Sequence, residues 1–227
     1  MKILVAFEES QEVTKAFRNL GFEAYSCDMQ ESSGNHPEWH IQGDAIKEAY
    51  SGKYTLMVAH PPCTRLTRRA QYWNVKNSLQ VEKEQAIEFF ITLSNAPIKY
   101  KAIENPIGIM NSKYSKPTQI IQPFEYGDPE QKATCLWLTG LPKLKPTKIV
   151  EPKYHVSKTG RKYFFNDKIW DKKLRAKLRS KTFPGIAKAM AEQWGAILTA
   201  GTAESVDKKL ITTSMQLNLF TSDELRH

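Results

Sequence analysis

Short apolar runs and helix-like segments alternate through the first half of the chain, and this alternation restricts its possible folds more than any other feature. A continuous apolar run such as residues 2–7 is typical of a strand buried on both faces. Strands that alternate with helices predict a parallel sheet covered by helices. The sequence therefore predicts the α/β fold class. The expected strands are 2–7, 22–27, 54–59 and 100–103, and the clearest expected helices are 10–20 and 78–95.

Local signals set the ends of these segments. Ser10 precedes the first helix and predicts its N-cap, and Gly21 ends that helix. Residues 29–42 are rich in Ser, Gly, Asn, His and Pro and predict a loop. A late helix is expected to start near Phe183-Pro184, because proline is tolerated in a first helical turn. Its apolar stripe indicates core packing rather than a cofactor site, and consists of Ile186, Met190, Trp194 and Ile197.

Acidic and proline-bearing turns follow the expected strands. They are Glu8-Glu9, Asp28, Pro61-Pro62-Cys63 and Glu104-Asn105-Pro106. Parallel sheets bind ligands at the carboxyl ends of their strands, so these turns predict a ligand site. Cys63 is a candidate nucleophile, and Glu104 would place a carboxylate near its thiol. Two alternatives stay open, since Cys63 could be an inert buried thiol and Asp28 could serve only its own turn.

The positive charge of the chain is concentrated in one stretch. The net charge is +9 and the sequence pI is about 9.3. Between residues 143 and 181, fourteen Lys and Arg side chains stand against three acidic ones, and aromatic residues lie among them. Such a block predicts a polyanion partner, whereas the alternative is a solvated basic surface. The candidate DNA-binding residues here are Arg161, Lys162, Lys172, Lys173, Arg175 and Arg179.

Several classes of protein are excluded by the sequence. No apolar run reaches the roughly 18 residues of a membrane span, and the acidic pair after residues 3–7 argues against a signal peptide. The three cysteines, Cys27, Cys63 and Cys135, contain no CxxC pair, so we predict neither a disulfide framework nor a metal site. A cytoplasmic location is the resulting expectation.

The order of these motifs resembles the DNA cytosine-5 methyltransferase family, and most closely its short, phage-type members. The resemblance begins with Phe7, Asp28, Gly43-Asp44, Pro61-Pro62-Cys63 and Glu104-Asn105-Pro106. It continues with Tyr126-Gly127-Asp128-Pro129 through Leu136-Trp137-Leu138, which is similar to the family's YGxPQxRxR segment and the following strand. Pro184-Gly185-Ile186-Ala187 resembles the start of a late family helix. The similarity runs from about residue 3 to residue 198 in family order.

The resemblance implies a Rossmann-like class I methyltransferase fold, S-adenosylmethionine as cofactor and DNA as partner. Cys63 would attack C6 of a flipped-out cytosine, and Glu104 would hydrogen-bond or protonate N3 of the base. Pro62 and Asn105 complete these two catalytic motifs. The cofactor would lie across the strand ends, in contact with Phe7 (adenine), Asp28 (ribose), Asp44 (adenine amino group) and Pro61.

Three features depart from the family pattern. The first turn, Phe7-Glu8-Glu9-Ser10, has no glycine, and its two carboxylates predict a more acidic cofactor pocket. Lys132 and Thr134 stand where the family has arginines, and Lys132 is a further candidate DNA-binding residue. The basic segment is short, so phosphate contacts are expected to dominate over sequence reading.

We expect three parts in the chain. They are a catalytic domain (1–142 with 182–199), a small basic target-binding segment (143–181) and a flexible tail (200–227). In the tail, residues 216–220 resemble the QLxLF peptide with which bacterial DNA-processing proteins dock on the replicative sliding clamp. The candidate clamp-binding residues are Gln216, Leu217, Leu219 and Phe220. The alternative is a chance amphipathic remnant, or a segment that folds back on its own domain.

Three functions stay open at this point. The leading one is a DNA cytosine-5 methyltransferase that uses S-adenosylmethionine. A second is a catalytically silent relative that binds DNA and the clamp, and a third is a pyrimidine-modifying transferase with another donor. The presence of Cys63 and Glu104 favours the two enzymes, whereas the altered first turn favours the silent relative.

Overall fold

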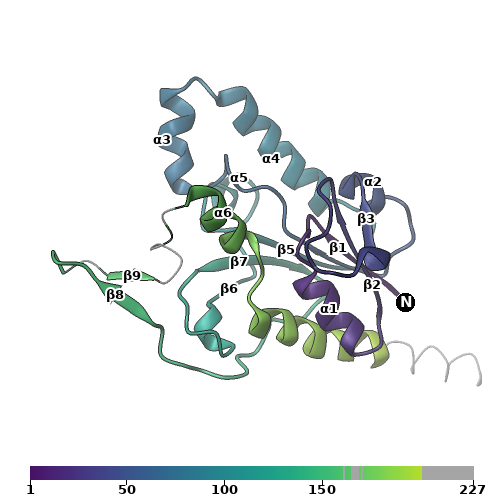
Figure 1. The fold of residues 1–227 in the computed structure, drawn as a ribbon. Helices are drawn as coiled ribbons and strands as arrows, with labels where there is room; N and C mark the ends of the chain where they lie inside the picture. Colours follow the sequence, from purple (N-terminus) through teal and green to yellow (C-terminus); the bar gives the residue numbers. More distant parts are fainter. Residues whose placement is uncertain (161, 165–168, 170, 201–227) are drawn as a thin grey trace, which may run out of the picture.

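A seven-stranded sheet forms the centre of the molecule in the computed structural model, which describes residues 1–160, 162–164, 169 and 171–200 (Figure 1). The strand order is β3-β2-β1-β4-β5-β7-β6. The sheet strands are β1 (Lys2–Ala6), β2 (Glu23–Asp28), β3 (His40–Gln42), β4 (Leu56–Ala59), β5 (Tyr100–Pro106), β6 (Gln119–Ile121) and β7 (Thr134–Thr139).

The four strands expected from the apolar runs are β1, β2, β4 and β5, and they pair in parallel. β3 continues the parallel sheet on the outer side of β2. β7 runs antiparallel to both of its neighbours, β5 and β6. The structure thus confirms the predicted fold class, which is α/β and Rossmann-like with a mostly parallel central sheet.

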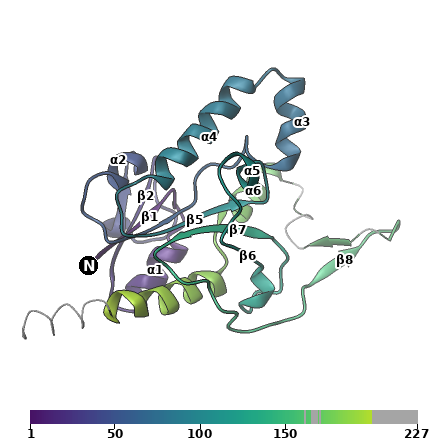
Figure 2. The same cartoon turned by 180° about the vertical axis from the view of Figure 1, so that it is seen from behind.

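Helices cover both faces of the sheet. They are α1 (Glu12–Asn19), α2 (Ala45–Ala49), α3 (Arg68–Lys76), α4 (Gln80–Ser94), α5 (Met110–Lys113), α6 (Lys172–Ser180) and a helix over residues 184–200. Two short 3₁₀ helices, η1 (Pro37–Trp39) and η2 (Pro123–Glu125), lie in the connections. Figures 1 and 2 show α1 and the 184–200 helix on one face, with α2 and α4 on the other. Among the described residues, no helix is both long and apolar enough to cross a membrane.

Each face of the sheet has its own hydrophobic core. On one side Phe17 of α1 and Trp194 of the late helix pack against Ile3 and Val5 of β1. The indole of Trp194 is completely buried and donates to the Pro142 carbonyl at 3.0 Å. Ile186 and Met190 of the predicted stripe lie in this core with Trp194, as expected, whereas Ile197 is only half-buried and Leu198 is buried instead. Each such large side chain stabilises the fold by roughly 1.5–3 kcal/mol.

The other core packs α2 and α4 against the opposite face of the sheet. Ala45, Ile87, Phe90 and Leu93 contribute to it. The nearby Lys101 side chain is also buried, and its ammonium donates to the carbonyls of residues 94 and 96 at 2.8 Å each. Because these carbonyls lie at the end of α4, the buried lysine satisfies groups that the helix leaves unpaired.

The start of α1 differs from the prediction, since Ser10 is not its N-cap. Gln11 occupies that position with a left-handed φ of 58° and makes no side-chain cap hydrogen bond. The Glu8 carboxylate caps the helix instead. It accepts from the Val13 amide at 2.7 Å, from the Thr14 amide at 3.2 Å and from the Thr14 hydroxyl at 2.7 Å. A buried carboxylate next to the helix N-terminus is also favoured by the helix dipole.

Three of the unexpected elements lie in the first half of the chain. The predicted loop 29–42 contains η1 and the short edge strand β3. α3 precedes the expected long helix, which the structure confirms as α4. Thr67 caps α3 by accepting from the Ala70 amide at 3.1 Å. The late helix begins at residue 184, as predicted.

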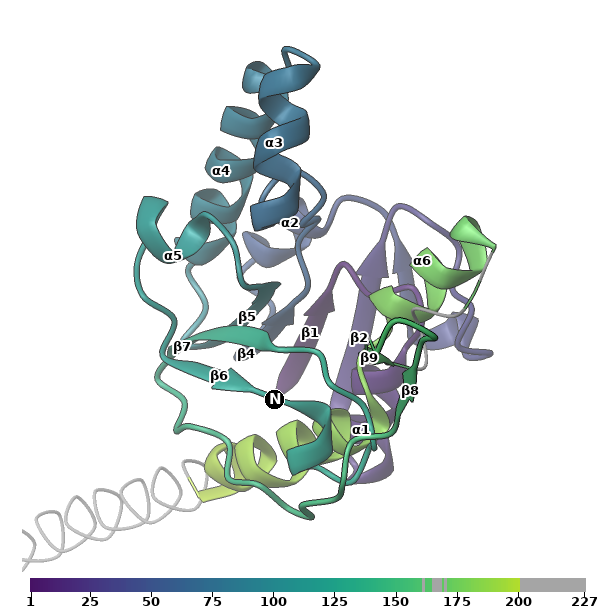
Figure 3. The same cartoon turned by 90° about the vertical axis from the view of Figure 1, so that its left-hand side faces the viewer.

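Two parts of the chain project from the same side of the molecule. Figures 1 and 3 show the α3–α4 pair as one projection, and β8 (Tyr154–Val156) with β9 (Lys162–Phe164) as the other. β8 and β9 form a separate antiparallel pair inside the predicted basic segment. The start of that segment lies on the main body, because Leu144 is buried in the core and its amide donates to the Gln119 side chain at 2.8 Å.

Candidate active site

The carboxyl ends of β4 and β5 bring the two candidate catalytic motifs together. Ala59 and Ile103 are paired in register, so the residues that follow them, His60 and Glu104, are neighbours across the sheet edge. The Asn105 amide donates to the Pro61 carbonyl at 3.3 Å and ties the two turns to each other. The sequence predicted that a carboxylate would lie near Cys63. In the structure the turns that carry Cys63 and Glu104 are adjacent, and the Glu104 charge raises the pKa of the Cys63 thiol.

Glu104 is held mainly by a histidine that the sequence analysis did not single out. His60 Nδ1 lies 2.8 Å from Glu104 Oε2, and the two side chains are only 9% and 15% exposed. Burial opposes ionisation of Glu104. The hydrogen bond with His60 and the positive charge of Lys132 outweigh that effect, so the pKa of Glu104 is lowered. Glu104 is therefore a carboxylate at neutral pH in this structure.

The Cys63 thiol is half-buried in a turn closed by a hydrogen bond from the Leu66 amide to the Cys63 carbonyl at 2.9 Å. Burial raises the pKa of Cys63, and the charge of Glu104 raises it further, while Lys132 and Arg179 act in the opposite direction. The unliganded protein therefore keeps Cys63 as a thiol at neutral pH. Ionisation of the thiol requires a change in the charges around it.

Lys132 links this site to α6. Its ammonium donates to the Arg179 carbonyl at 2.8 Å and lies 5.9 Å from the centroid of the Phe183 ring. Thr134, the second position where the family has an arginine, is buried nearby at the start of β7. Lys132 therefore brings a positive charge close to both Glu104 and Cys63.

The cavity beside Glu104 is small. It measures about 10 Å³, no larger than the roughly 10–15 Å³ that a single water requires. Its walls come from the strand ends and from the segment that joins α6 to the late helix. They are Glu104, Lys132, Thr134, Thr182, Phe183, Ile186 and Met190. This cavity is far smaller than a pyrimidine ring.

The candidate cofactor-binding residues lie at the ends of β1, β2 and β4 and at the start of α2. Phe7 has a left-handed φ of 62° and packs its ring edge against Phe89 at 5.2 Å. Asp28 is half-buried and accepts from the Gln30 amide at 2.9 Å. Asp44 is exposed and caps α2 by accepting from the amide of residue 46 at 2.8 Å, and Pro61 is buried.

The first turn has the shape of a glycine turn without containing a glycine. Both Phe7 and Gln11 adopt left-handed backbone conformations, which glycine adopts without strain and larger residues rarely adopt. The expected cofactor pocket at this turn gains less negative charge than predicted, because Glu8 is buried and points into the N-terminus of α1. Burial raises the pKa of Glu8, and the nearby His60 and the hydrogen bonds from α1 counteract part of that rise.

α3 carries a basic and aromatic surface directly after the Cys63 turn. Tyr72 and Trp73 are 64% and 43% exposed, and the Lys76 ammonium lies 6.0 and 5.2 Å from their rings. Arg68 and Arg69 are exposed on the same helix, and residues 64–80 contain no acidic side chain. We call this the α3 surface. The sequence analysis missed it because the predicted basic block lies elsewhere.

α3 is fixed to the turn that carries Cys63. The side chains of Gln71 and Asn74 both donate to the Arg65 carbonyl at 3.0 Å. Thr67 and Gly108 form an isolated antiparallel bridge, which connects this turn to the segment after β5. The α3 surface and the two catalytic motifs therefore share one rigid support.

The remaining predicted residues lie partly outside the described chain. Arg175 and Arg179 lie in α6, and Arg179 is close enough to influence Cys63. The backbones of Lys162, Lys172 and Lys173 lie in β9 and α6. Arg161, the predicted flexible tail after residue 200 and the clamp-binding residues 216–220 lie outside the described residues. Within the described ranges, no group of three His, Cys, Asp or Glu side chains could hold a metal ion.

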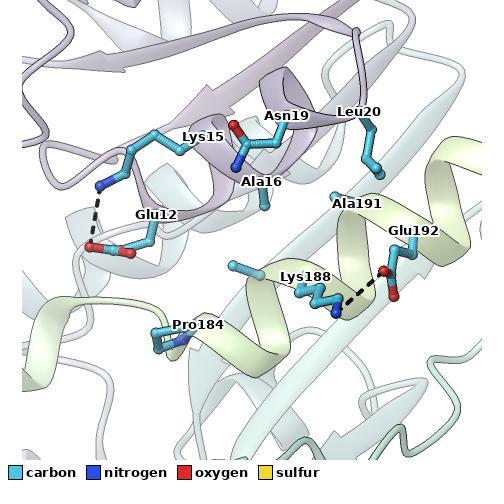
Figure 4. A pocket seen from close by; sticks show the side chains of 10 residues that line it. Glu12, Lys15, Ala16, Asn19, Leu20, Pro184, Lys188, Ala191 and Glu192 are labelled. Carbon is cyan, nitrogen blue, oxygen red and sulfur yellow. Dashed lines mark ion pairs between the residues drawn. The ribbon is translucent and has the colours of Figure 1, made fainter.

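A second, larger cavity lies away from these residues. It measures about 370 Å³ and lies between α1 and the 184–200 helix, as Figure 4 shows. Ion pairs border it, with Lys15 and Glu12 at 3.7 Å and Lys188 and Glu192 at 3.8 Å. None of its lining residues is a predicted site residue.

Comparison with known proteins finds similarity in solved structures only. The sequence matches no family model and no curated protein. A candidate DNA modification methyltransferase encoded within a prophage (E. coli) is 14% identical, with a TM-score of 0.44, and the match covers 66% of this chain and 52% of that one. The S. pombe Dnmt2 methyltransferase is 15% identical, with a TM-score of 0.44 and coverages of 63% and 51%.

A third similar structure is a DNMT2 mutant from Spodoptera frugiperda. It is 17% identical, with a TM-score of 0.37, and the match covers 67% of this chain and 55% of that one. The chain therefore spans about half the length of the solved structures it matches. These likenesses concern the fold alone.

Proposed function

We propose that this protein transfers a methyl group from S-adenosylmethionine to C5 of cytosine in DNA. One observation carries the proposal: a cysteine and a glutamate stand at adjacent strand ends, close enough for the glutamate to raise the pKa of the cysteine. Attack on a pyrimidine requires a soft nucleophile that approaches C6 from one face of the ring and an acid that meets N3 in the ring plane, across the ring from C6. Cys63 and Glu104 supply these two groups.

The reaction follows from the chemistry of these residues. Cys63 gives its thiol proton to the Glu104 carboxylate, which passes it to N3 as the thiolate adds to C6 and the C5–C6 double bond opens. C5 is then nucleophilic and accepts the methyl group. Water takes the C5 proton as Cys63 departs and the double bond is restored, and the N3 proton returns through Glu104 to the Cys63 sulfur. S-adenosylmethionine, when bound, supplies the electrophilic methyl group.

Features of the strand ends fit a nucleoside-containing cofactor. The left-handed turn at Phe7 gives the backbone the shape that a glycine-rich turn would give. The half-buried carboxylate of Asp28 stands after the second strand, where Rossmann-like folds bind ribose hydroxyls. Glu8 points away into α1, so the turn does not place this carboxylate against the ligand. Phe7, Asp28, Asp44 and Pro61 are the residues we propose to hold the cofactor.

The described basic side chains favour a nucleic acid, rather than a free nucleotide, as the substrate. The α3 surface offers Arg68, Arg69 and Lys76 beside two exposed aromatic rings, next to the Cys63 turn. Arginine and lysine bind phosphates, and aromatic rings stack on unpaired bases. We propose that DNA contacts α3 on one side of the site, and Lys132, α6 and the β8–β9 segment on the other.

Methyl transfer can be tested directly. Purified protein is incubated with labelled S-adenosylmethionine and mixed-sequence single- or double-stranded DNA, and the nucleosides are analysed after digestion. We expect labelled 5-methylcytosine from the wild type and none from Cys63→Ser, because a hydroxyl is a far poorer nucleophile than a thiolate at neutral pH. Label on another base or at another position would refute the proposal, as would full activity of Cys63→Ser.

A specific observation favours one alternative, a silent relative that binds DNA. Cys63 is a thiol in the unliganded protein, and the cavity beside Glu104 measures only about 10 Å³. A silent relative would bind DNA but would transfer no methyl group to it. Calorimetry with S-adenosylmethionine separates the cases further, because a silent relative that has lost its cofactor site would give no heat of binding.

We also propose that residues 216–220 dock on a bacterial sliding clamp. The support is the sequence alone, QLNLF, in which Leu217, Leu219 and Phe220 can be buried in a groove. A clamp that encircles DNA would raise the local concentration of the enzyme on the duplex.

A further inference from the structure

His60 occupies a central place in the site that the proposed reaction leaves without a role. It follows β4 directly, and its amide donates to the Ala6 carbonyl of β1 at 3.0 Å. Its side chain is only 9% exposed. The imidazole therefore lies between the end of β1, where the cofactor is proposed, and the end of β5, which carries Glu104.

The two ring nitrogens of His60 have different environments. Nδ1 lies 2.8 Å from Glu104 Oε2, whereas Nε2 is buried and has no hydrogen-bond partner among the described residues. On the β1 side Glu8 is within electrostatic range of His60, and both of its oxygens accept hydrogen bonds from α1. With Nδ1 donating to Glu104, one carboxylate oxygen is fixed and the other is left for a base.

The groups that face Glu104 from the remaining elements are few. Lys132 approaches from the segment before β7 and Cys63 from the turn after β4, and Cys135 of β7 is also within electrostatic range. Of these groups, only His60 has a hydrogen bond with the Glu104 carboxylate. An acid that must meet N3 of a base has to keep its orientation, and a misplacement of about 1 Å can cost a factor of about 100 in rate.

We propose that His60 is a positioning residue, which holds the Glu104 carboxylate through Nδ1 so that its free oxygen faces the base. This inference rests on the proposed function for its consequence in catalysis, but its structural part can be tested without any reaction. The matched variants are His60→Ala, which removes the donor, and His60→Asn, whose amide nitrogen can take the place of Nδ1.

The first test measures Glu104 itself in the unliganded full chain. Protein labelled with ¹³C at the glutamate carboxyl carbons is titrated by NMR, and Glu104→Gln identifies the signal. In the wild type the pKa of Glu104 should lie below its ordinary value of 4.5, since His60 and Lys132 favour the carboxylate. His60→Ala should move it above that value because burial then dominates, and His60→Asn should move it back down. An unchanged Glu104 titration in a folded His60→Ala variant would overturn the proposal.

The second test is kinetic. His60→Ala should lower kcat for methyl transfer about 100-fold while KM for DNA stays within about twofold, and His60→Asn should recover at least a tenth of the wild-type rate. Thermal unfolding of each variant shows whether it is folded. Equal loss in folded Ala and Asn variants, or wild-type kcat in His60→Ala, would contradict a positioning role. If the wild type transfers no methyl group, the proposed function fails, and the titration still decides the role of His60.

Discussion

Gly108 is the position where a single methyl group should disturb the site most directly. A Cβ added there would overlap the Leu66 carbonyl oxygen and stand 3.0 Å from its carbon and 3.2 Å from Thr67 Cα. All three atoms are backbone, so relief requires the Cys63 turn and the segment after β5 to move apart. Overpacking of this kind costs about 1–3 kcal/mol. For a domain of about 200 residues we therefore expect Gly108→Ala to lower Tm by about 2–12 °C.

The matched control is Gly43→Ala, because a Cβ at Gly43 would have no atom within 4 Å. Its free energy of unfolding should stay within about 0.5 kcal/mol of the wild type. Thermal unfolding of both variants measures the difference, and mass spectrometry after iodoacetamide treatment measures how fast Cys63 is alkylated. Leu66 belongs to the Cys63 turn, so Gly108→Ala should also change that rate. A Tm equal to that of the control, with unchanged alkylation, would refute the close approach.

Three other predictions follow from the site and its surroundings. Glu104→Gln should lower the free energy of unfolding at pH 7 but much less near pH 3, as measured by denaturant titrations at both pH values. The reason is that a carboxyl whose pKa is lowered in the folded state stabilises the protein above its ordinary pKa. This stabilisation is lost as pH falls through the folded pKa. Replacing Arg68, Arg69 and Lys76 with Glu should weaken binding to all DNA sequences alike. The slope of log K against log salt concentration should become shallower by about 0.9 per lost phosphate contact, whereas an unchanged affinity would show that the α3 surface does not bind DNA. A peptide of residues 212–224 should bind a bacterial sliding clamp with micromolar affinity and lose binding when residues 219 and 220 become Ala; no binding of the wild-type peptide at about 100 μM would end that hypothesis.

The central strands could be predicted because their side chains are buried on both faces. The cores of β1 and β4 are completely buried, and such strands appear in the sequence as unbroken apolar runs. β3 and β6 have only three residues each, too few for a pattern to emerge. The sequence of α3 shows no apolar stripe, and in the structure its Tyr72 and Trp73 are exposed. The one clear sign of a helix in this segment is the capping residue Thr67.

The sequence identified the motifs of the candidate site but not the contacts between their side chains. Cys63 follows β4 and Glu104 lies near the end of β5, and the parallel register of these adjacent strands places the two motifs together. The role of Glu8 could not be predicted, because it depends on the left-handed Gln11 that moves Ser10 out of the capping position. His60 was missed although the signal exists, since His60 and Glu104 each stand one residue beyond the last paired residues, Ala59 and Ile103.

Covalent trapping tests the central claim most directly. The protein is incubated with S-adenosylmethionine and an oligonucleotide in which cytosines are replaced by 5-fluorocytosine, whose C5 fluorine cannot leave as a proton. We predict an adduct with the summed mass of protein, oligonucleotide and one methyl group, and peptide mapping should place the bond at Cys63. The absence of any adduct under conditions where the DNA is bound, or an adduct at a different residue, would contradict the account.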